Sequence, residues 1–210
     1  MNYEIAKYLY EVPYPYKIDE ALNFIKSSSD DFKLHKTLTF AIDYKTKLQS
    51  FQLLSGTIGI KDIDYFNKKA KIGYWIGKQY QGKGIATECV KLVVNYAFDE
   101  LKLEEISACV FPENNSSIRV LEKNGFEKTK EVNEYHPLSN RYKFFSLYNK
   151  KQDEYKFIIN NTYSGSKRGV QSRNTISCIQ LLLLRTYYLN YYCSNTLYHI
   201  LFEFEFKNYD

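Results

Sequence analysis

Apolar and polar residues alternate along the first three quarters of the chain in a pattern that predicts strands interrupted by helices. In residues 85–101, apolar side chains recur every three or four positions from Cys89 to Ala97, which indicates an amphipathic helix. The same spacing predicts shorter helices over residues 19–27 and 116–123. Alternating or apolar runs predict strands over residues 38–43, 53–60, 71–76, 105–110, 127–133 and 142–148. Strands that alternate with helices, beside hairpin-like strand pairs, predict an α/β fold with a mixed sheet.

The last quarter of the chain has a different character. Residues 159–173 are polar and contain serine and glycine, which is typical of a linker. Beyond them, Arg185 carries the only formal charge between Arg173 and Glu203. The uninterrupted aliphatic run in this segment is far shorter than a transmembrane helix of about 20 residues. We therefore predict one domain over residues 1–156 and a C-terminal extension over residues 157–210.

Composition and charge exclude several classes of function. Apolar residues make up 44% of the chain and charged residues 25%, as in globular proteins. The net charge of +5 is spread along the sequence, so no basic block predicts a nucleic-acid partner. The four cysteines lack the spacing of metal ligands, and we expect no metal. The first 15 residues have no apolar core of a signal peptide, which favours a cytoplasmic protein.

A glycine-bearing turn carries the first candidate chemistry. It follows the strand that contains Trp75 and Ile76, and it opens directly into the helix predicted over residues 85–101. The turn consists of Gln81, Gly82, Lys83, Gly84, Ile85 and Ala86. Such a turn aims several backbone N–H groups at one point, with the positive end of the helix dipole behind them. It predicts a phosphate-binding site, although a plain strand-to-helix turn also explains glycines in isolation.

A second element lies further along the chain. Asn114 follows the strand at residues 105–110, and Ser117 lies at the start of the helix at residues 116–123. We expect the strands at residues 71–76 and 105–110 to form a parallel pair that splays apart, so that a linear amide-containing ligand bonds to an open strand edge. Asn114 would bond that ligand and Ser117 would point into the same crevice. The alternatives are a turn-forming Asn114 and a Ser117 that only starts the helix.

At these residues the sequence resembles the GNAT superfamily of acetyl-CoA-dependent N-acetyltransferases. The turn Gln81-x-x-Gly84-x-Ala86 is similar to the pyrophosphate-binding signature of that superfamily. The run from Asn114 to Phe126 resembles the branch that contains the ribosomal-protein alanine N-acetyltransferases. The resemblance covers residues 4–156. It implies a mostly antiparallel sheet flanked by helices, with a splayed parallel strand pair.

The resemblance also implies a reaction, in which acetyl passes directly from acetyl-CoA to a primary amine on a protein N-terminus or a small molecule. A backbone N–H near Trp75 and Ile76 would polarise the acetyl carbonyl. Ser117 would donate a proton to the departing thiolate, because Leu121 stands where a tyrosine has that role elsewhere in the superfamily. The residues implied to bind the cofactor are Trp75, Ile76, Gln81, Gly82, Lys83, Gly84, Ile85, Ala86, Asn114 and Ser117.

Three departures from the family pattern leave alternatives open. Lys71 stands where many relatives carry a glutamate proposed as the base, so the base falls to another carboxylate, to His136 or to solvent. The family normally begins with a strand ahead of the segment that begins this chain. We therefore expect the first strand to be missing and an open sheet edge that invites pairing with another segment or chain. Residues 157–210 have no counterpart in the family.

Two further functions therefore stand beside an active N-acetyltransferase. An acyl-CoA-binding pseudoenzyme would keep the cofactor cleft with a degenerate acceptor site. A membrane-associated interaction protein would act through the extension, with a membrane-surface or oligomerising helix over residues 176–192. For the extension we favour the interpretation that it has no selected fold, because neither an amphipathic face nor a strand alternation is clean.

Overall fold

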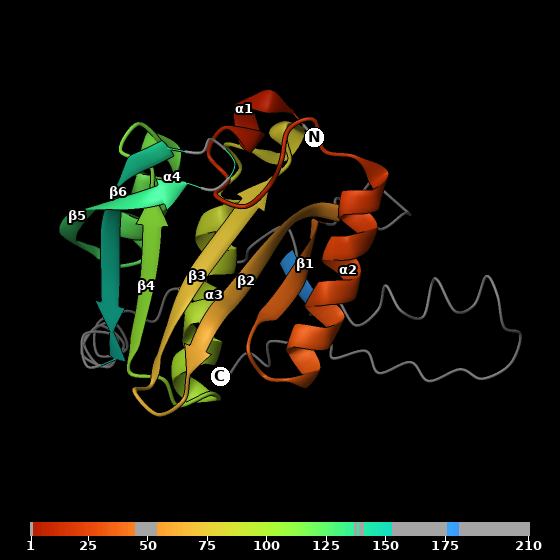
Figure 1. Cartoon of the computed structure of the whole chain (residues 1–210). Coiled ribbons are helices and arrows are strands. Elements are labelled where there is room, and N and C mark those ends of the chain that lie inside the picture. Colours follow the sequence, from red (N-terminus) through yellow and green to blue (C-terminus); the bar gives the residue numbers. More distant parts are fainter. Residues whose placement is uncertain (1, 45–53, 137, 139–140, 153–175, 181–210) are drawn as a thin grey trace, which may run out of the picture.

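The computed structural model describes residues 2–44, 54–136, 138, 141–152 and 176–180. Its strands are β1 (Leu38–Tyr44), β2 (Leu54–Asp64), β3 (Lys69–Ile76), β4 (Glu105–Val110), β5 (Glu127–His136), β6 (Arg141–Lys151) and β7 (Ile176–Gln180). Its helices are α1 (Tyr3–Ala6), α2 (Ile18–Lys33), α3 (Ile85–Asp99) and α4 (Asn115–Lys123), with a 3-10 turn η1 (Lys78–Tyr80). The strands form one sheet in the order β5-β6-β4-β3-β2-β1-β7, and only β3 and β4 are parallel neighbours (Figure 1). The predicted mixed, mostly antiparallel sheet is confirmed.

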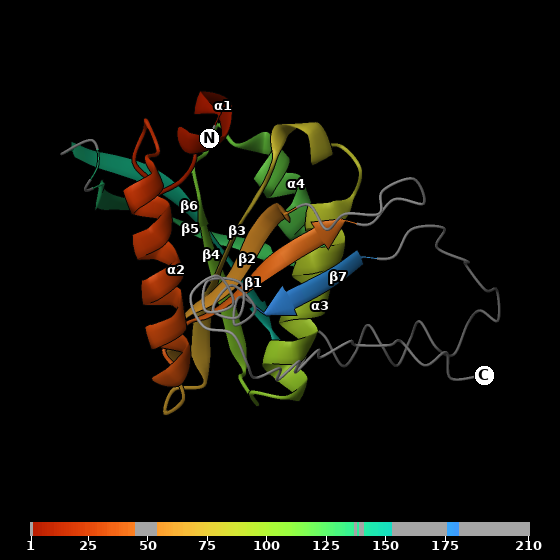
Figure 2. The same ribbon diagram turned by 90° about the vertical axis from the view of Figure 1, so that its right-hand side faces the viewer.

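The sheet is covered by helices on both faces. Figure 2 shows α2 on one side of the sheet and α3 with α4 on the other. The side chains that α3 buries against the sheet recur every three or four residues: Ile85, Cys89, Val90, Val93, Val94, Ala97 and Phe98. This spacing is the one that predicts the helix from the sequence, and the helix ends two residues earlier than expected because the chain turns at Glu100.

The parallel contact between β3 and β4 is short. It consists of Lys69, Ala70 and Lys71 opposite Glu105, Ile106 and Ser107. Beyond these pairs, β3 stays paired with β2 as far as Ile76, and β4 stays paired with β6 as far as Val110. Within the described strands no further pair joins β3 to β4, so the two strands splay apart. The predicted splayed parallel pair is confirmed.

The sheet edge beside β1 is formed by part of the C-terminal extension. β7 pairs antiparallel with β1, from Phe40 opposite Gln180 to Tyr44 opposite Ile176. The edge of β1 is thus paired with another segment, because its exposed N–H and C=O groups require partners. Residues 176–180 form a strand rather than part of the helix expected over residues 176–192. Residues 181–192 and the linker expected over 159–173 lie outside the described residues.

The N-terminal elements depart from the sequence-based expectation. The sequence did not predict α1, whose first turn is capped by Asn2: its Oδ1 accepts a hydrogen bond from the Glu4 N–H at 2.8 Å. The helix predicted over residues 19–27 continues as α2 to Lys33. The segment after α1 then runs across the sheet face on which α2 lies (Figure 1).

Close packing of β2 against β3 positions the end of β3. A Cβ added to Gly56 would lie 2.2 Å from the carbonyl oxygen of Trp75, whereas a Cβ on Gly73 would meet no heavy atom within 4 Å. We therefore expect Gly56→Ala to lower the free energy of unfolding by about 1–3 kcal/mol, the usual cost of overpacking. Urea denaturation followed by circular dichroism measures this, with Gly73→Ala as the matched control. Equal unfolding midpoints for the two variants would contradict the packing described for this strand pair.

Candidate functional site

The glycine turn opens α3 without a side-chain cap. Gly84 is the N-cap residue of α3 with a φ of +80°, a left-handed conformation that favours glycine. Gly82 has a φ of +75°, and a Cβ at either glycine would meet nothing within 4 Å. The space over the first turn of α3 is therefore open. The uncapped N–H groups there, together with the helix dipole, form a favourable site for an anion.

The other predicted residues of the turn contribute in different ways. Gln81 ties the turn to the end of β3, because its Nε2 donates a hydrogen bond to the carbonyl of Ile76 at 3.0 Å. Lys83 is exposed, and its Nζ lies 5.5 Å from the centre of the Tyr80 ring. The side chain of Ile85 is buried in the core, so only its backbone can face a ligand. Ala86 is half-buried in the first turn of α3.

The end of β3 presents backbone groups toward the gap. Gly77 N–H donates to the carbonyl of Ser55 on β2 at 2.8 Å. Successive residues of a strand direct their backbone groups to opposite sides, so the N–H of Ile76 points away from β2 toward the splayed gap. Of the two residues predicted to polarise an acyl carbonyl, Ile76 rather than Trp75 is thus placed to donate into the gap.

Asn114 and Ser117 lie where β4 leads into α4. Asn114 is the N-cap residue, and its Oδ1 accepts a hydrogen bond from Ser117 N–H at 3.2 Å. The oxygen of Asn114 therefore caps α4, a role that the sequence did not predict for this residue. An amide has two ends, and Nδ2 of Asn114 has no hydrogen-bond partner among the described residues. The cap holds the amide in place and leaves Nδ2 able to donate to a ligand.

Tyr74 connects β3 to the first turn of α4. Its hydroxyl lies 2.9 Å from Ser117 Oγ and 3.3 Å from the carbonyl oxygen of Ser117. Burial disfavours the phenolate and raises the pKa of Tyr74 to about 12, against a smaller opposing effect of the hydrogen bond with Ser117. Tyr74 was not predicted as a site residue. The signal was a phenol on the buried face of a strand, which requires a polar partner.

Asn124 is a second residue that the sequence did not single out for the site. Its Nδ2 donates to the carbonyl of Thr87 in α3 at 3.2 Å and to that of Val120 in α4 at 2.8 Å. The buried Lys150 of β6 donates to the backbone carbonyl of Asn124. The start of α3 and the end of α4 are thus held at a fixed separation beside the turn.

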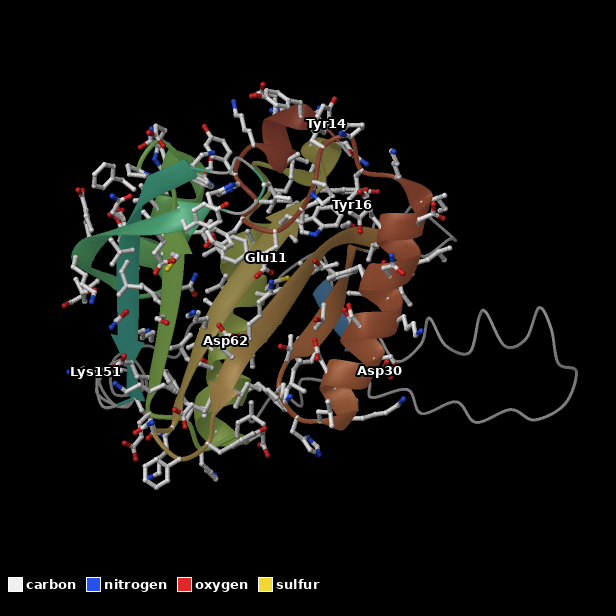
Figure 3. All side chains as sticks on the ribbon, in the orientation of Figure 1. Glu11, Tyr14, Tyr16, Asp30, Asp62 and Lys151 are labelled. Carbon is white, nitrogen blue, oxygen red and sulfur yellow. The ribbon has the colours of Figure 1, made fainter. Side chains whose placement is uncertain are left out.

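The face of the sheet that carries α2 is charged. Lys71 forms an ion pair with Asp62 at 2.9 Å, and this hydrogen bond raises the pKa of the Lys71 ammonium. Lys71 is therefore protonated at neutral pH and is no base. Asp62, at a φ of +50° in a β-bulge of β2, lies with Glu11 in front of the strands in Figure 3. Glu11 forms an ion pair with Lys61 at 3.1 Å.

His136, one of the candidate bases, lies in an aromatic cluster. Only 5% of it is exposed, and its ring centre is 5.2 Å from that of Tyr10, 5.8 Å from Phe111 and 6.5 Å from Phe145. Burial, and next the charge of Lys143, lower the pKa of His136. The imidazole is neutral at pH 7, but its enclosure gives it a packing role in this structure.

Two features are absent from the part of the chain that the structure describes. No three His, Cys, Asp or Glu side chains gather there as ligands for a metal ion. No described helix is long and apolar enough to cross a membrane.

The model of a family described as "Acetyltransferase (GNAT) domain" matches residues 2–127. Bacillus subtilis (strain 168) YjcK, named as an N-acetyltransferase, is 50% identical over 78 residues, which cover 37% of this chain and 38% of YjcK. The protein of the same organism named "Putative ribosomal N-acetyltransferase YdaF" is 42% identical over 73 residues, which cover 35% of this chain and 40% of YdaF. The matches thus span about two fifths of the length of these relatives.

A solved structure shares the arrangement. The microcin C7 self immunity acetyltransferase MccE, solved in complex with acetyl-CoA and AMP, has a TM-score of 0.60 and 27% sequence identity to this chain. The similarity covers 69% of this chain and 77% of MccE.

The buried His136 predicts a pH dependence of stability. The unfolded chain takes up this proton at a pKa near 6.5, above the folded value, so protons favour unfolding. The contribution of the neutral imidazole is complete above about pH 6.5 and is lost as the pH falls through the folded-state pKa. We expect His136→Phe to show a smaller fall in melting temperature between about pH 7 and about pH 5 than the wild type. The exposed His35, changed to Asn, is the control; identical pH dependence of all three proteins would refute the assignment.

Proposed function

The chain belongs to the GNAT acetyltransferase family, and we propose that it binds acetyl-CoA at the splay of β3 and β4 and transfers the acetyl group to a primary amine. The observation that carries the proposal is the convergence of three elements at one end of the sheet. These are the open N-terminus of α3, the unpaired gap between β3 and β4, and the capped start of α4. Together they provide donors for a phosphate, a free strand edge for an amide chain, and a hydroxyl for a leaving group.

Each part of acetyl-CoA has a matching group. The N–H groups of residues 82–86 and the dipole of α3 suit the pyrophosphate. Nδ2 of Asn114 suits a carbonyl of the pantetheine chain. The N–H of Ile76 suits the acetyl carbonyl, where it would stabilise the charge that develops on oxygen during attack. Lys83 is exposed and would add its positive charge near the phosphates.

The acceptor is a primary amine on a protein N-terminus or on a small molecule. YdaF is named for ribosomal acetylation and supports the first of these. The amine must be neutral to attack, and solvent accepts its proton. A cytoplasmic location stays a prediction. The extension after residue 156 has no proposed role in the reaction.

A pseudoenzyme is the second candidate, and the ion pair of Lys71 with Asp62 is the observation that favours it. Lys71, which is protonated, stands where the family resemblance implies a glutamate. Its ion pair also occupies the carboxylate of Asp62. Such a protein would bind acetyl-CoA with the same donors and would not turn it over. Binding and turnover must therefore be measured separately.

Blocking the turn tests the binding part of the proposal. Gly84→Glu places a bulky carboxylate against the space meant for the pyrophosphate, and we expect it to weaken acetyl-CoA binding by at least about 100-fold. Isothermal titration calorimetry measures this. Gly84→Ala is the matched control, since it carries the same backbone strain at a φ of +80° without the charge. Undiminished affinity of the glutamate variant would place the phosphates elsewhere.

Turnover distinguishes the enzyme from the pseudoenzyme. We expect wild-type protein to release free CoA above the rate of background hydrolysis with at least one member of a panel of N-terminal peptides and polyamines. Ser117→Ala, which removes the hydroxyl for the leaving group, is expected to lower kcat by roughly 100-fold with little change in acetyl-CoA affinity. Binding without release of CoA from any amine would favour the pseudoenzyme. Equal rates of wild type and variant would show that Ser117 is not the donor.

A further inference from the structure

We propose that Tyr74 is a positioning residue for Ser117: its hydroxyl donates to Ser117 Oγ, so that the single hydrogen of Ser117 is kept for the departing sulfur. The inference rests on the proposed function, because it deepens the role of Ser117 there. It assigns a task to a half-buried phenol that the cofactor contacts described above do not use.

The geometry brings the two hydroxyls together from separate elements. Tyr74 lies on β3 beyond the last pair with β4, and Ser117 lies in the first turn of α4. The separation of 2.9 Å between the hydroxyl oxygens is within the usual range of an O–H···O hydrogen bond. The alternative acceptor for Tyr74, the carbonyl oxygen of Ser117, is further away at 3.3 Å. The side-chain contact is therefore the stronger of the two.

Counting hydrogens sets the direction of this bond. Each hydroxyl has one hydrogen and two lone pairs, so either oxygen could donate. If Ser117 donated to Tyr74, no hydrogen would remain for a ligand. A phenol is more acidic than an aliphatic alcohol and is the better donor, and burial keeps Tyr74 protonated over the working pH range because its pKa is about 12. Tyr74 thus donates, and Ser117 accepts.

The backbone of Ser117 is held as well. Its N–H donates to Asn114 Oδ1, which fixes the first turn of α4 relative to the end of β4. Tyr74 then selects the orientation of the side chain. One hydrogen bond thus holds the backbone N–H of Ser117 and another holds its hydroxyl oxygen. The hydroxyl hydrogen stays available to a ligand. A preorganised donor costs no rearrangement when charge develops on the sulfur.

The chemical step balances without a proton leaving Tyr74. The amine nitrogen forms a bond to the acetyl carbon, and the bond from that carbon to sulfur breaks with both electrons going to sulfur. The nitrogen loses its extra proton to solvent. Ser117 donates a hydrogen bond to the thiolate, and donation from Tyr74 polarises the Ser117 O–H and strengthens it. The thiolate then takes a proton from solvent.

Removing the phenolic oxygen tests this role. Tyr74→Phe keeps the ring, and we expect kcat to fall about tenfold while KM for acetyl-CoA changes less than about twofold. The double variant with Ser117→Ala should be no slower than Ser117→Ala alone, because Tyr74 acts through Ser117. Tyr96→Phe, which changes a half-buried tyrosine of α3, is the matched control and should keep the wild-type kcat. Full additivity of the two losses would overturn the proposal.

A binding measurement extends the test beyond turnover. A thiol ionises near pH 8.5, so a site that stabilises thiolate binds CoA more tightly than desulfo-CoA as the pH rises from about 7 to about 10. Calorimetry should show this rise for wild type and a smaller rise for Tyr74→Phe, with melting temperatures that confirm both are folded at each pH. An equal rise in both proteins would overturn the role of Tyr74. Absence of CoA binding to the wild type would instead refute the proposed function.

Discussion

The shortness of the parallel ladder between β3 and β4 is the constraint on which the site depends. Only the pairs from Lys69 opposite Glu105 to Lys71 opposite Ser107 join these two strands, while β3 stays paired with β2 as far as Ile76 and β4 with β6 as far as Val110. The gap therefore weakens the sheet little, but it leaves backbone groups that need partners. Gln81 takes the carbonyl of Ile76. The N–H of the same residue points into the gap. It is a hydrogen-bond donor that a carbonyl oxygen of a ligand can accept from.

The elements around the gap are fixed by polar ties rather than by apolar packing alone. Asn124 joins α3 to α4, and Tyr74 joins β3 to α4 through Ser117. Behind them, the apolar face of α3 fills the core and fixes the direction in which its N-terminus points. An uncapped helix start gains from an anion only when it stays in place, and here the core and the ties both hold it. The cofactor side of the site is thus preorganised before any ligand arrives.

What the sequence could predict follows from how local each feature is. The spacing of apolar residues predicts α3, and Gly84 predicts a left-handed turn before it. Both features can be predicted because each depends on residues close together in the sequence. The contact of Tyr74 with Ser117 joins residues 43 positions apart and depends on the splay of the sheet, which no local pattern encodes. β7 is a similar case: residues 176–180 have no clean alternation, and the edge of β1 supplies the partners that make them a strand.

The two faces of the sheet are stabilised by different interactions. This difference explains why the sequence predicts the cofactor but not the acceptor. Backbone geometry and part-buried hydrogen bonds build the proposed cofactor side, so we expect substitutions there to cost stability. On the other face, the ion pair of Lys71 with Asp62 has side chains 58% and 67% exposed, and such pairs contribute little to folding. We therefore expect a substitution that changes a charge on this face to leave the fold intact. A family can therefore share one fold while the side chains on this face differ between its members.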